Sequence, residues 1–382
     1  MHVFIAALHR PIKPTGVCRH AANLARCLAE KPEVTKVSLV IGAWQEDYFQ
    51  TTFALSDKID LVTVKIKNSS IVRNLWFLQG LPKLADRLNA DVVHLAFPFP
   101  FLRSRFKAPV VTTVHDLYPY ECPENFGFPR VLFNQLFLKL AIANSDALPC
   151  VSQITLDKLK FYFPQLKPQQ QLEVVYNYVD FAGLETYAPQ QITANKKFLL
   201  TVAQHRQNKN LDLLIRAYAK LRQEEKIDLD CDLVIVGTTG PETDKIESLI
   251  ANFNLGDRVY LLSALDDSEL GWLYQNCRAF VIPSSTEGFC LPLAEALHFS
   301  DRVVCSDIPI FREIATEKCT YFSLENDPLD NLIQALLRVM EHPQALDRKD
   351  INRFDRAHIA QQYLNLYEGI SQSHDYVVVP ST

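Results

Sequence analysis

Two glutamates lie eight positions apart in the segment STEGFCLPLAE, which follows the apolar run from Ala279 to Ile282. Pro292 suits the first turn of a helix, where its missing N–H costs nothing. Glu287 is therefore expected in the loop before that helix, and Glu295 about one turn inside it. The N–H groups of a helix start suit a diphosphate, and carboxylates suit the hydroxyls of a ribose or sugar. A Glu287 that only caps the helix and a Glu295 that faces solvent fit the same pattern.

Two cations, Arg206 and Lys209, lie between the apolar run from Phe198 to Ala203 and a helical pattern that begins at Leu211. Positive side chains at the start of a helix oppose its dipole, at a cost of about 0.3–1 kcal/mol each. An anion bound at the same place would offset that cost. The pattern indicates a clamp for a diphosphate, with an exposed basic loop as the alternative.

His115 follows the apolar run from Val110 to Val114. A histidine at the carboxyl end of a strand can contact a substrate hydroxyl or phosphate, although a single histidine is more often structural. His94 lies inside an apolar run and is interpreted as a core residue. Gly16 and Gly237 each follow a predicted strand, where glycine allows either a close backbone approach to a ligand or an ordinary tight turn.

Three aspartates, Asp228, Asp230 and Asp232, have the DxD spacing that can hold a divalent metal beside a nucleotide sugar. They precede a predicted strand and so lie at its amino end, away from the edge where parallel sheets bind ligands. We interpret them as solvated turn residues. The nine cysteines include no CxxC pair, which predicts buried thiols in a reducing compartment and no metal site.

Short apolar runs alternate with helical patterns along the whole chain. The runs lack polar alternation, which is typical of strands buried on both faces of a parallel sheet. Two sets occur, separated by a linker at 181–196 with little apolar periodicity, so the sequence predicts an α/β protein with two Rossmann-like domains. The predicted strands are 2–8, 37–41, 59–66, 91–95, 109–114, 144–151 and 173–176 in the first set, and 198–203, 232–236, 259–262, 279–282 and 303–306 in the second.

Composition narrows the classes of function. The 382 residues, 48% of them hydrophobic, suffice for two domains. Only 11 are glycine, and neither GxGxxG nor a P-loop motif occurs, which disfavours a dehydrogenase and a P-loop NTPase. The net charge of −5 argues against nucleic acid as a partner. Residues 1–180 hold 20 Lys and Arg against 15 Asp and Glu, and the rest hold 19 against 29, which suggests two domains with different tasks.

No signal peptide or transmembrane run is visible, so a cytoplasmic protein is expected. Two segments, 73–84 and 97–107, mix aromatic residues with cations. Such segments would suit a peripheral contact of the N-terminal domain with the inner face of a membrane, and a lipid-linked acceptor. Buried apolar elements with exposed cations fit these segments equally well.

Taken in order, these segments resemble the retaining glycosyltransferases of family 4, also called glycosyl transferases group 1. That family has the GT-B architecture, in which two Rossmann-like domains face each other across a cleft. The stretch from Glu287 to Glu295 is similar to the family's E-x7-E motif. TVAQHRQNKNLDLLIRAY resembles its strand, basic loop and helix, and DLVIVGTTGP the glycine turn that follows. VVTTVHDL, ALPCVSQIT and VVYNYVD are similar to segments of its first domain.

The resemblance implies a donor site for a nucleotide diphosphate sugar, with no cofactor and no metal. Glu295 would bind the ribose and Glu287 the donor sugar, while Arg206 and Lys209 would balance the leaving diphosphate. His115 would contact the transferred sugar, and Gly16 would let the first loop approach the phosphate. The diphosphate or sugar would also meet the backbone N–H groups of Phe289, Cys290 and Leu291.

The implied division is an acceptor-binding domain at 1–180, the linker at 181–196, a donor domain at 197–354, and a C-terminal helix with tail at 355–382 that crosses back to the first domain. The implied reaction moves a hexose to a glycan, glycolipid or other hydroxyl acceptor by front-face attack, with retention at the anomeric carbon. VTTVHDL and KNL resemble mannosyltransferase members, which favours GDP-mannose and leaves UDP-sugars open. A nucleotide-sugar epimerase of the same fold and a non-catalytic sugar-binding protein are the alternatives.

The chain departs from the family pattern at several positions. Ala203, Cys290 and Ser300 stand where family members often have glycine, and Gln204 replaces the usual arginine after the strand. More of the phosphate charge would then fall to Arg206 and Lys209.

Overall fold

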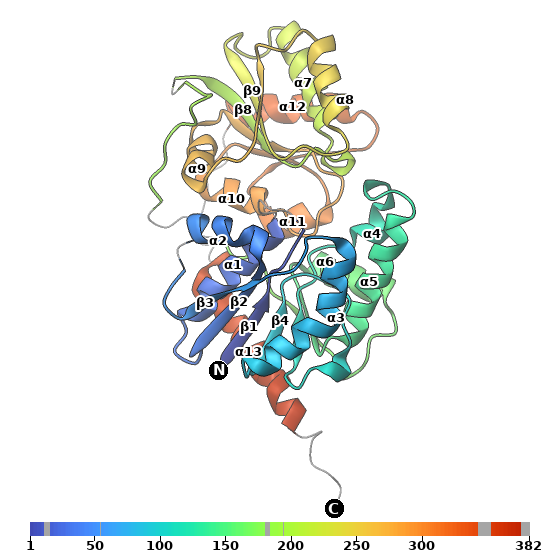
Figure 1. The fold of residues 1–382 in the computed structure, drawn as a ribbon. Coiled ribbons are helices and arrows are strands. Elements are labelled where there is room, and N and C mark those ends of the chain that lie inside the picture. Colours follow the sequence, from blue (N-terminus) through green and yellow to red (C-terminus); the bar gives the residue numbers. More distant parts are fainter. Residues whose placement is uncertain (11–15, 54, 180–183, 194, 343–352, 376–382) are drawn as a thin grey trace, which may run out of the picture. The chain divides into compact units, whose positions relative to one another are not determined.

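The computed structural model describes residues 1–10, 16–53, 55–179, 184–193, 195–342 and 353–375 (Figure 1). The chain divides into two compact units, Met1–Tyr178 with Arg353–Thr382, and Val179–Asn352. Residues 180–183 and 194 of the predicted linker region lie outside the described residues, and the rest of that linker, 184–193 and 195–196, contains no helix or strand.

The first unit is built on a parallel sheet of seven described strands in the order β3-β2-β1-β4-β5-β6-β7. Most of its strand residues are buried, as expected for a sheet covered on both faces. The strands are β1 His2–Ala6, β2 Lys36–Gly42, β3 Ile59–Val64, β4 Val92–Leu95, β5 Val110–Thr112, β6 Ala147–Cys150 and β7 Gln171–Val174.

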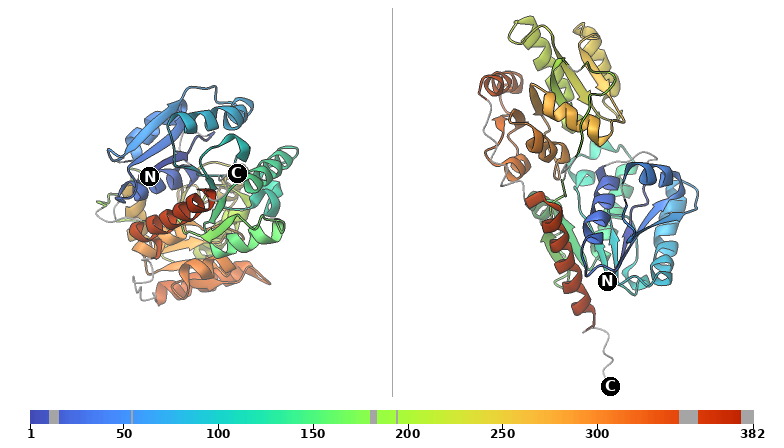
Figure 2. Two further views of the ribbon diagram at one scale, coloured as in Figure 1. Left: turned by 90° about the horizontal axis from the view of Figure 1, so that it is seen from below. Right: turned by 90° about the vertical axis from the view of Figure 1, so that its left-hand side faces the viewer.

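Helices cover both faces of this sheet because successive strand residues point to opposite sides. Val3 and Ile5 pack with α1 and α13, whereas Phe4 and Ala6 pack with α3. Figure 2 shows α13, the dark red helix, lying along this unit. The helices are α1 Gly16–Ala29, α2 Glu46–Thr52, α3 Ser70–Arg87, α4 Tyr118–Glu121, α5 Arg130–Asn144, α6 Gln153–Tyr162 and α13 Arg356–Asp375.

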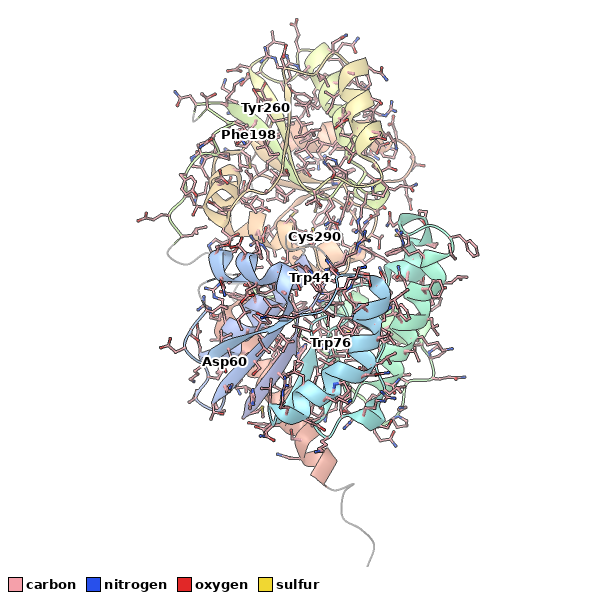
Figure 3. All side chains as sticks on the ribbon, in the orientation of Figure 1. Trp44, Asp60, Trp76, Phe198, Tyr260 and Cys290 are labelled. Carbon is pink, nitrogen blue, oxygen red and sulfur yellow. The ribbon has the colours of Figure 1, made fainter. Side chains whose placement is uncertain are left out.

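The second unit repeats the plan with six described parallel strands in the order β10-β9-β8-β11-β12-β13. Phe198 and Phe280 contact aromatic side chains of α9, and Leu199 and Ile235 belong to a core formed with α7, α8 and α12. Figure 3 labels Phe198 on β8. The strands are β8 Lys197–Val202, β9 Cys231–Val236, β10 Val259–Leu262, β11 Ala279–Ile282, β12 Val303–Ser306 and β13 Thr320–Phe322. The helices are α7 Leu211–Gln223, α8 Thr243–Asn252, α9 Asp267–Asn276, α10 Leu291–Phe299, α11 Pro309–Ala315 and α12 Pro328–Glu341.

In each sheet the strand order reverses at one central strand, so that later strands are added on its other side. In the first unit β1 lies between β2 and β4, and in the second β8 lies between β9 and β11. In each sheet the carboxyl ends of the two central strands, β1 with β4 and β8 with β11, lie side by side at this point, and the space beyond them is where open parallel sheets bind ligands. The prediction of two Rossmann-like parallel sheets is confirmed.

Some predicted boundaries were wrong. The strand expected from residue 144 begins only at Ala147, because α5 continues to Asn144, whose side-chain amide donates to the carbonyl of Leu140. The strand expected at 173–176 is Gln171–Val174. The sequence pattern missed β13, which is only three residues long.

The aromatic centres of the two segments considered for membrane contact, 73–84 and 97–107, are buried. Phe77, Phe99, Phe101 and Phe106 belong to the same core cluster as α3. The structure thus shows these segments mainly as core elements. Among the described residues, no helix combines the length and the apolar character needed to cross a membrane.

Candidate functional site

Two loops that are far apart in the sequence meet at the point where the second sheet changes direction. The loop after β8 carries a 3-10 turn, Gln207–Lys209, and the loop after β11 runs toward α10. The side-chain amide of Asn208 donates to the carbonyl of Thr286 at 3.1 Å, and that of Asn210 donates to Pro283 at 2.8 Å. The N–H of Ser285 donates to Asn208 at 2.8 Å. These bonds hold the basic loop after β8 and the glutamate-containing loop after β11 together in one site.

Lys209 and Glu287 form an ion pair at the centre of this junction. The Nζ of Lys209 lies 2.5 Å from Oε1 of Glu287, and the two side chains are only 14% and 6% exposed. The alternative of an exposed basic loop is therefore wrong for Lys209. Arg206, just before the 3-10 turn, is partly exposed.

The start of α10 adjoins this ion pair along the chain. The helix begins at Leu291 with Pro292 in its first turn, as predicted, and Figure 3 labels Cys290 at its start. Cys290 has a φ of 70°, in the left-handed region that favours glycine, which agrees with the glycine that the family resemblance led us to expect at this position. Phe289, Cys290 and Leu291 thus lead into the first turn, at the end of the helix whose dipole favours an anion.

Glu295 lies inside α10 and is buried rather than solvated, with 8% exposed. The hydroxyl of Tyr274 on α9 donates to its Oε2 at 2.9 Å. Burial is the main cause, and the neighbouring carboxylate the second cause, of a Tyr274 pKa that lies well above its usual value. This hydroxyl therefore keeps its proton. Glu295 is therefore held in one orientation by a dedicated donor.

Gly237, after β9, is required by the protein's own backbone. A Cβ at this position would lie 1.9 Å from the carbonyl oxygen of Ala203. Gly240 has the same constraint, because a Cβ added there would lie 2.4 Å from the carbonyl oxygen of His205. These glycines let the loops after β8 and β9 pack together, and the predicted contact of Gly237 with a ligand stays a prediction.

In the first unit, the change of direction between β1 and β4 brings four histidines together. His115 donates from Nε2 to the carbonyl of Ala96 at 2.7 Å, and its ring meets that of His20 edge to face, with 4.7 Å between centroids. Burial lowers the pKa of His115 to about 4, that of His9 to about 4, and that of His94 to about 3. These imidazoles are neutral near pH 7, so they can bind uncharged hydroxyl groups but not balance a phosphate charge.

His94 and Gly16, also considered from the sequence, occupy different environments in the first unit. His94 is fully buried, as predicted, with its ring nitrogens 2.6 Å from the hydroxyl of Tyr367 and 2.7 Å from that of Thr113. Gly16 is the exposed first residue of α1. The positions before it, 11–15, lie outside the described residues, so the loop approach expected of Gly16 is not described.

The interpretation of the DxD aspartates as solvated is wrong for one of them. Asp232 is 1% exposed and pairs with Lys196 at 2.5 Å and Arg258 at 3.3 Å. It is the second residue of β9, so the sheet buries it and the two cations neutralise it. No group of three metal-ligating side chains occurs among the residues that the structure describes.

Three contributors to the second unit's site were missed by reasoning from sequence. Asn208 and Asn210 lay inside the quoted basic segment, and an amide next to a predicted strand end is a signal that could have found them. Tyr274 gave no local signal, because its role depends on the packing of α9 against α10.

The comparisons with known proteins match almost the whole chain. The family model "Glycosyltransferase Family 4" matches residues 14–182, and "Glycosyl transferases group 1" matches residues 185–357. The chain is 24% identical over 363 residues to the O-antigen chain mannosyltransferase RfbU of Salmonella typhimurium, covering 92% of this chain and 95% of that one.

Solved structures agree in fold. A sucrose-phosphate synthase from Thermosynechococcus elongatus superposes with a TM-score of 0.72 at 17% identity, over 98% of this chain and 100% of the other. Anabaena HepE in complex with UDP-glucose gives a TM-score of 0.63 at 15% identity, over 99% of each chain. Since the two family models cover both units and both sheets have the matching topology, the chain belongs to the glycosyltransferases of family 4 and has the GT-B fold.

Proposed function

We propose that the second unit binds a nucleotide diphosphate sugar at the carboxyl edge of its sheet, and that the protein transfers the sugar to a hydroxyl acceptor. The observation that carries this proposal is the ion pair of Lys209 and Glu287 next to the start of α10. It combines a cation for a diphosphate with a carboxylate for a sugar hydroxyl, beside N–H groups that favour an anion.

Each charged group then has one task. Arg206 and Lys209 balance the diphosphate, together with the N–H groups around Cys290. Glu287 accepts hydrogen bonds from the donor sugar, and Glu295, oriented by Tyr274, accepts them from the ribose. His115 in the first unit contacts a hydroxyl of the transferred sugar as a neutral imidazole.

Transfer proceeds with retention at the anomeric carbon. The bond from that carbon to the phosphate oxygen breaks, and the acceptor oxygen bonds on the same face. The acceptor proton passes to the departing phosphate, so the protein contributes orientation and positive charge rather than a strong base. Because Arg206 and Lys209 supply that charge, we expect the reaction to proceed without a metal, and turnover should be unchanged in EDTA.

The proposed donor is GDP-mannose, and the proposed acceptor is a glycan or a glycolipid. The similarity to a protein named as an O-antigen chain mannosyltransferase supports this choice. The UDP-glucose bound to the Anabaena neighbour supports a uridine donor as the second candidate.

A panel of nucleotide sugars tests the donor. Binding to the native state raises the unfolding temperature by mass action, so GDP-mannose should stabilise the protein more than UDP-glucose, and neither should stabilise Glu295→Ala. Incubation with donor and acceptor, followed by NMR of the product, reports the anomeric configuration. Equal stabilisation of Glu295→Ala by the donor would refute the site, and an epimerised nucleotide sugar formed from donor alone would favour the epimerase.

A further inference from the structure

Helix α5 of the first unit has an apolar outer face. Its buried side is formed by Leu138, Ala141 and Ile142. On the opposite side, at 100° per residue, the solvent-facing positions are again large and apolar. Phe128, just before the helix, is 82% exposed, and Leu132, Phe133 and Leu136 are 52%, 56% and 48% exposed.

A surface helix normally turns charged and polar side chains to water. Here four large apolar side chains within nine residues share one surface, which we call the α5 surface: Phe128, Leu132, Phe133 and Leu136. Elsewhere in the described chain, exposed large apolar residues are more sparsely distributed in the sequence, as Leu229 and Phe253 are in the second unit. A contiguous apolar surface of this kind marks an interaction site.

The charged residues within the segment that carries the α5 surface are positive, and of the two acids just before it Glu121 is paired with Lys158 while Glu124 is exposed. Residues 128–144 contain Arg130 and Lys139, both exposed, and no Asp or Glu. Residues 1–180 also carry the excess of cations, 20 against 15 acids. Apolar side chains flanked by cations match the chemistry of an anionic lipid bilayer, where rings and leucines enter the acyl boundary and cations meet headgroups.

The position of the α5 surface fits such a contact. In a parallel sheet the helices run opposite to the strands, so the N-terminal half of α5 lies toward the carboxyl ends of the strands. That half contains Leu132 and Leu136, and the chain between β5 and α5 carries His115. In Figure 1, α5 lies at the outside of the first unit.

We propose that the α5 surface binds an anionic lipid bilayer and brings the carboxyl edge of the first sheet to the headgroups. A lipid-linked acceptor would meet the protein there. The bilayer contact itself does not depend on the proposed sugar transfer, so vesicle binding and turnover are tested separately.

Sedimentation with lipid vesicles tests the proposal on the full chain. The protein should bind vesicles containing one third phosphatidylglycerol at least about tenfold better than pure phosphatidylcholine vesicles, given two cations at the surface. Leu132→Ser/Phe133→Ser/Leu136→Ser should lose most of the binding to both. Arg130→Gln/Lys139→Gln should lose only the preference for anionic vesicles, and added salt should have the same effect.

The matched control is Leu229→Ser/Phe253→Ser, which removes two exposed apolar side chains from the second unit. It should bind vesicles like the unaltered protein, and all variants should keep the same unfolding temperature because the changed side chains are exposed. Equal vesicle binding by the triple α5 variant and the unaltered protein would overturn the proposal. So would a dimer in light scattering that the triple variant converts to a monomer without any vesicle binding, because a second copy would then cover the surface.

Discussion

The two units have the same sheet plan but different chemistry where the sheets change direction. In the first unit, His9, His94 and His115 are held neutral by burial. In the second, Lys209 and Glu287 form an ion pair with 2.5 Å between Nζ and Oε1. A parallel sheet thus determines where a site lies, whereas the side chains at its edge determine whether the site suits hydroxyls or an anion.

Lowering the pH should produce the largest difference in stability between the two units. Unfolded histidines bind protons near pH 6.5, but the native first unit does not take them up until about pH 4 at His9 and His115 and about pH 3 at His94. The unfolded state therefore gains protons as the pH falls below 6.5, and the native state loses stability. Between pH 6.5 and 5 the expected loss is about 2 kcal/mol for each histidine.

Hydrogen exchange measured peptide by peptide at both pH values reads the two units separately. Peptides from β1, β4 and β5 should lose protection, whereas those from β8 and β11 should change less. Of the second unit's histidines, His205 has a pKa lowered by burial, so a small loss is expected there too. An equal loss in both units would show that these histidines do not distinguish them.

Breaking the charge pair should abolish the chemistry proposed for the second unit. Lys209→Met removes positive charge from the leaving diphosphate, and we expect turnover to fall about a thousandfold. It also leaves Glu287 buried without its cation, which should cost about 3 kcal/mol of stability. Steady-state kinetics and urea unfolding measure the two effects.

Two further variants separate stability from turnover. Lys209→Met/Glu287→Gln should recover most of the stability and none of the turnover. Lys196→Met removes a cation from another buried carboxylate, Asp232, which lies at the amino end of β9. This variant should lower stability but leave turnover unchanged. If Lys196→Met slowed the reaction as much as Lys209→Met, the special role of the Lys209 pair would be refuted.

The close packing of the loops after β8 and β9 is the next feature to test. Gly237→Ala places a Cβ against the carbonyl of Ala203, and should destabilise the second unit by about 3 kcal/mol. Gly256→Ala is the matched control, because no atom lies within 4 Å of a Cβ there. Thermal unfolding should distinguish the two, and equal melting temperatures would mean that the loops can move apart freely.

Much of this organisation could be predicted from the sequence, and the limits have physical causes. The strands 259–262, 279–282 and 303–306 were predicted to the residue, because buried apolar runs have sharp polar boundaries. Glu295 could be placed on a helix from Pro292, but not shown to be buried, since burial depends on α9, which is distant in sequence. The Lys209 to Glu287 contact spans 78 positions and follows only from the adjacency of β8 and β11.

Removing one hydroxyl should give the smallest effect and the most local one. Tyr274→Phe deletes the donor to Glu295, which should cost about 1.5 kcal/mol of stability and weaken nucleotide binding about fivefold with little change in the rate at saturation. Tyr218→Phe is the matched control, because it deletes a buried hydroxyl that donates to the carbonyl of Cys231 at 2.9 Å, at the amino end of β9. It should lower stability without changing nucleotide affinity. Calorimetric titration with the nucleotide compares the two variants, and equal affinities would mean that Glu295 needs no orienting partner to bind the ribose.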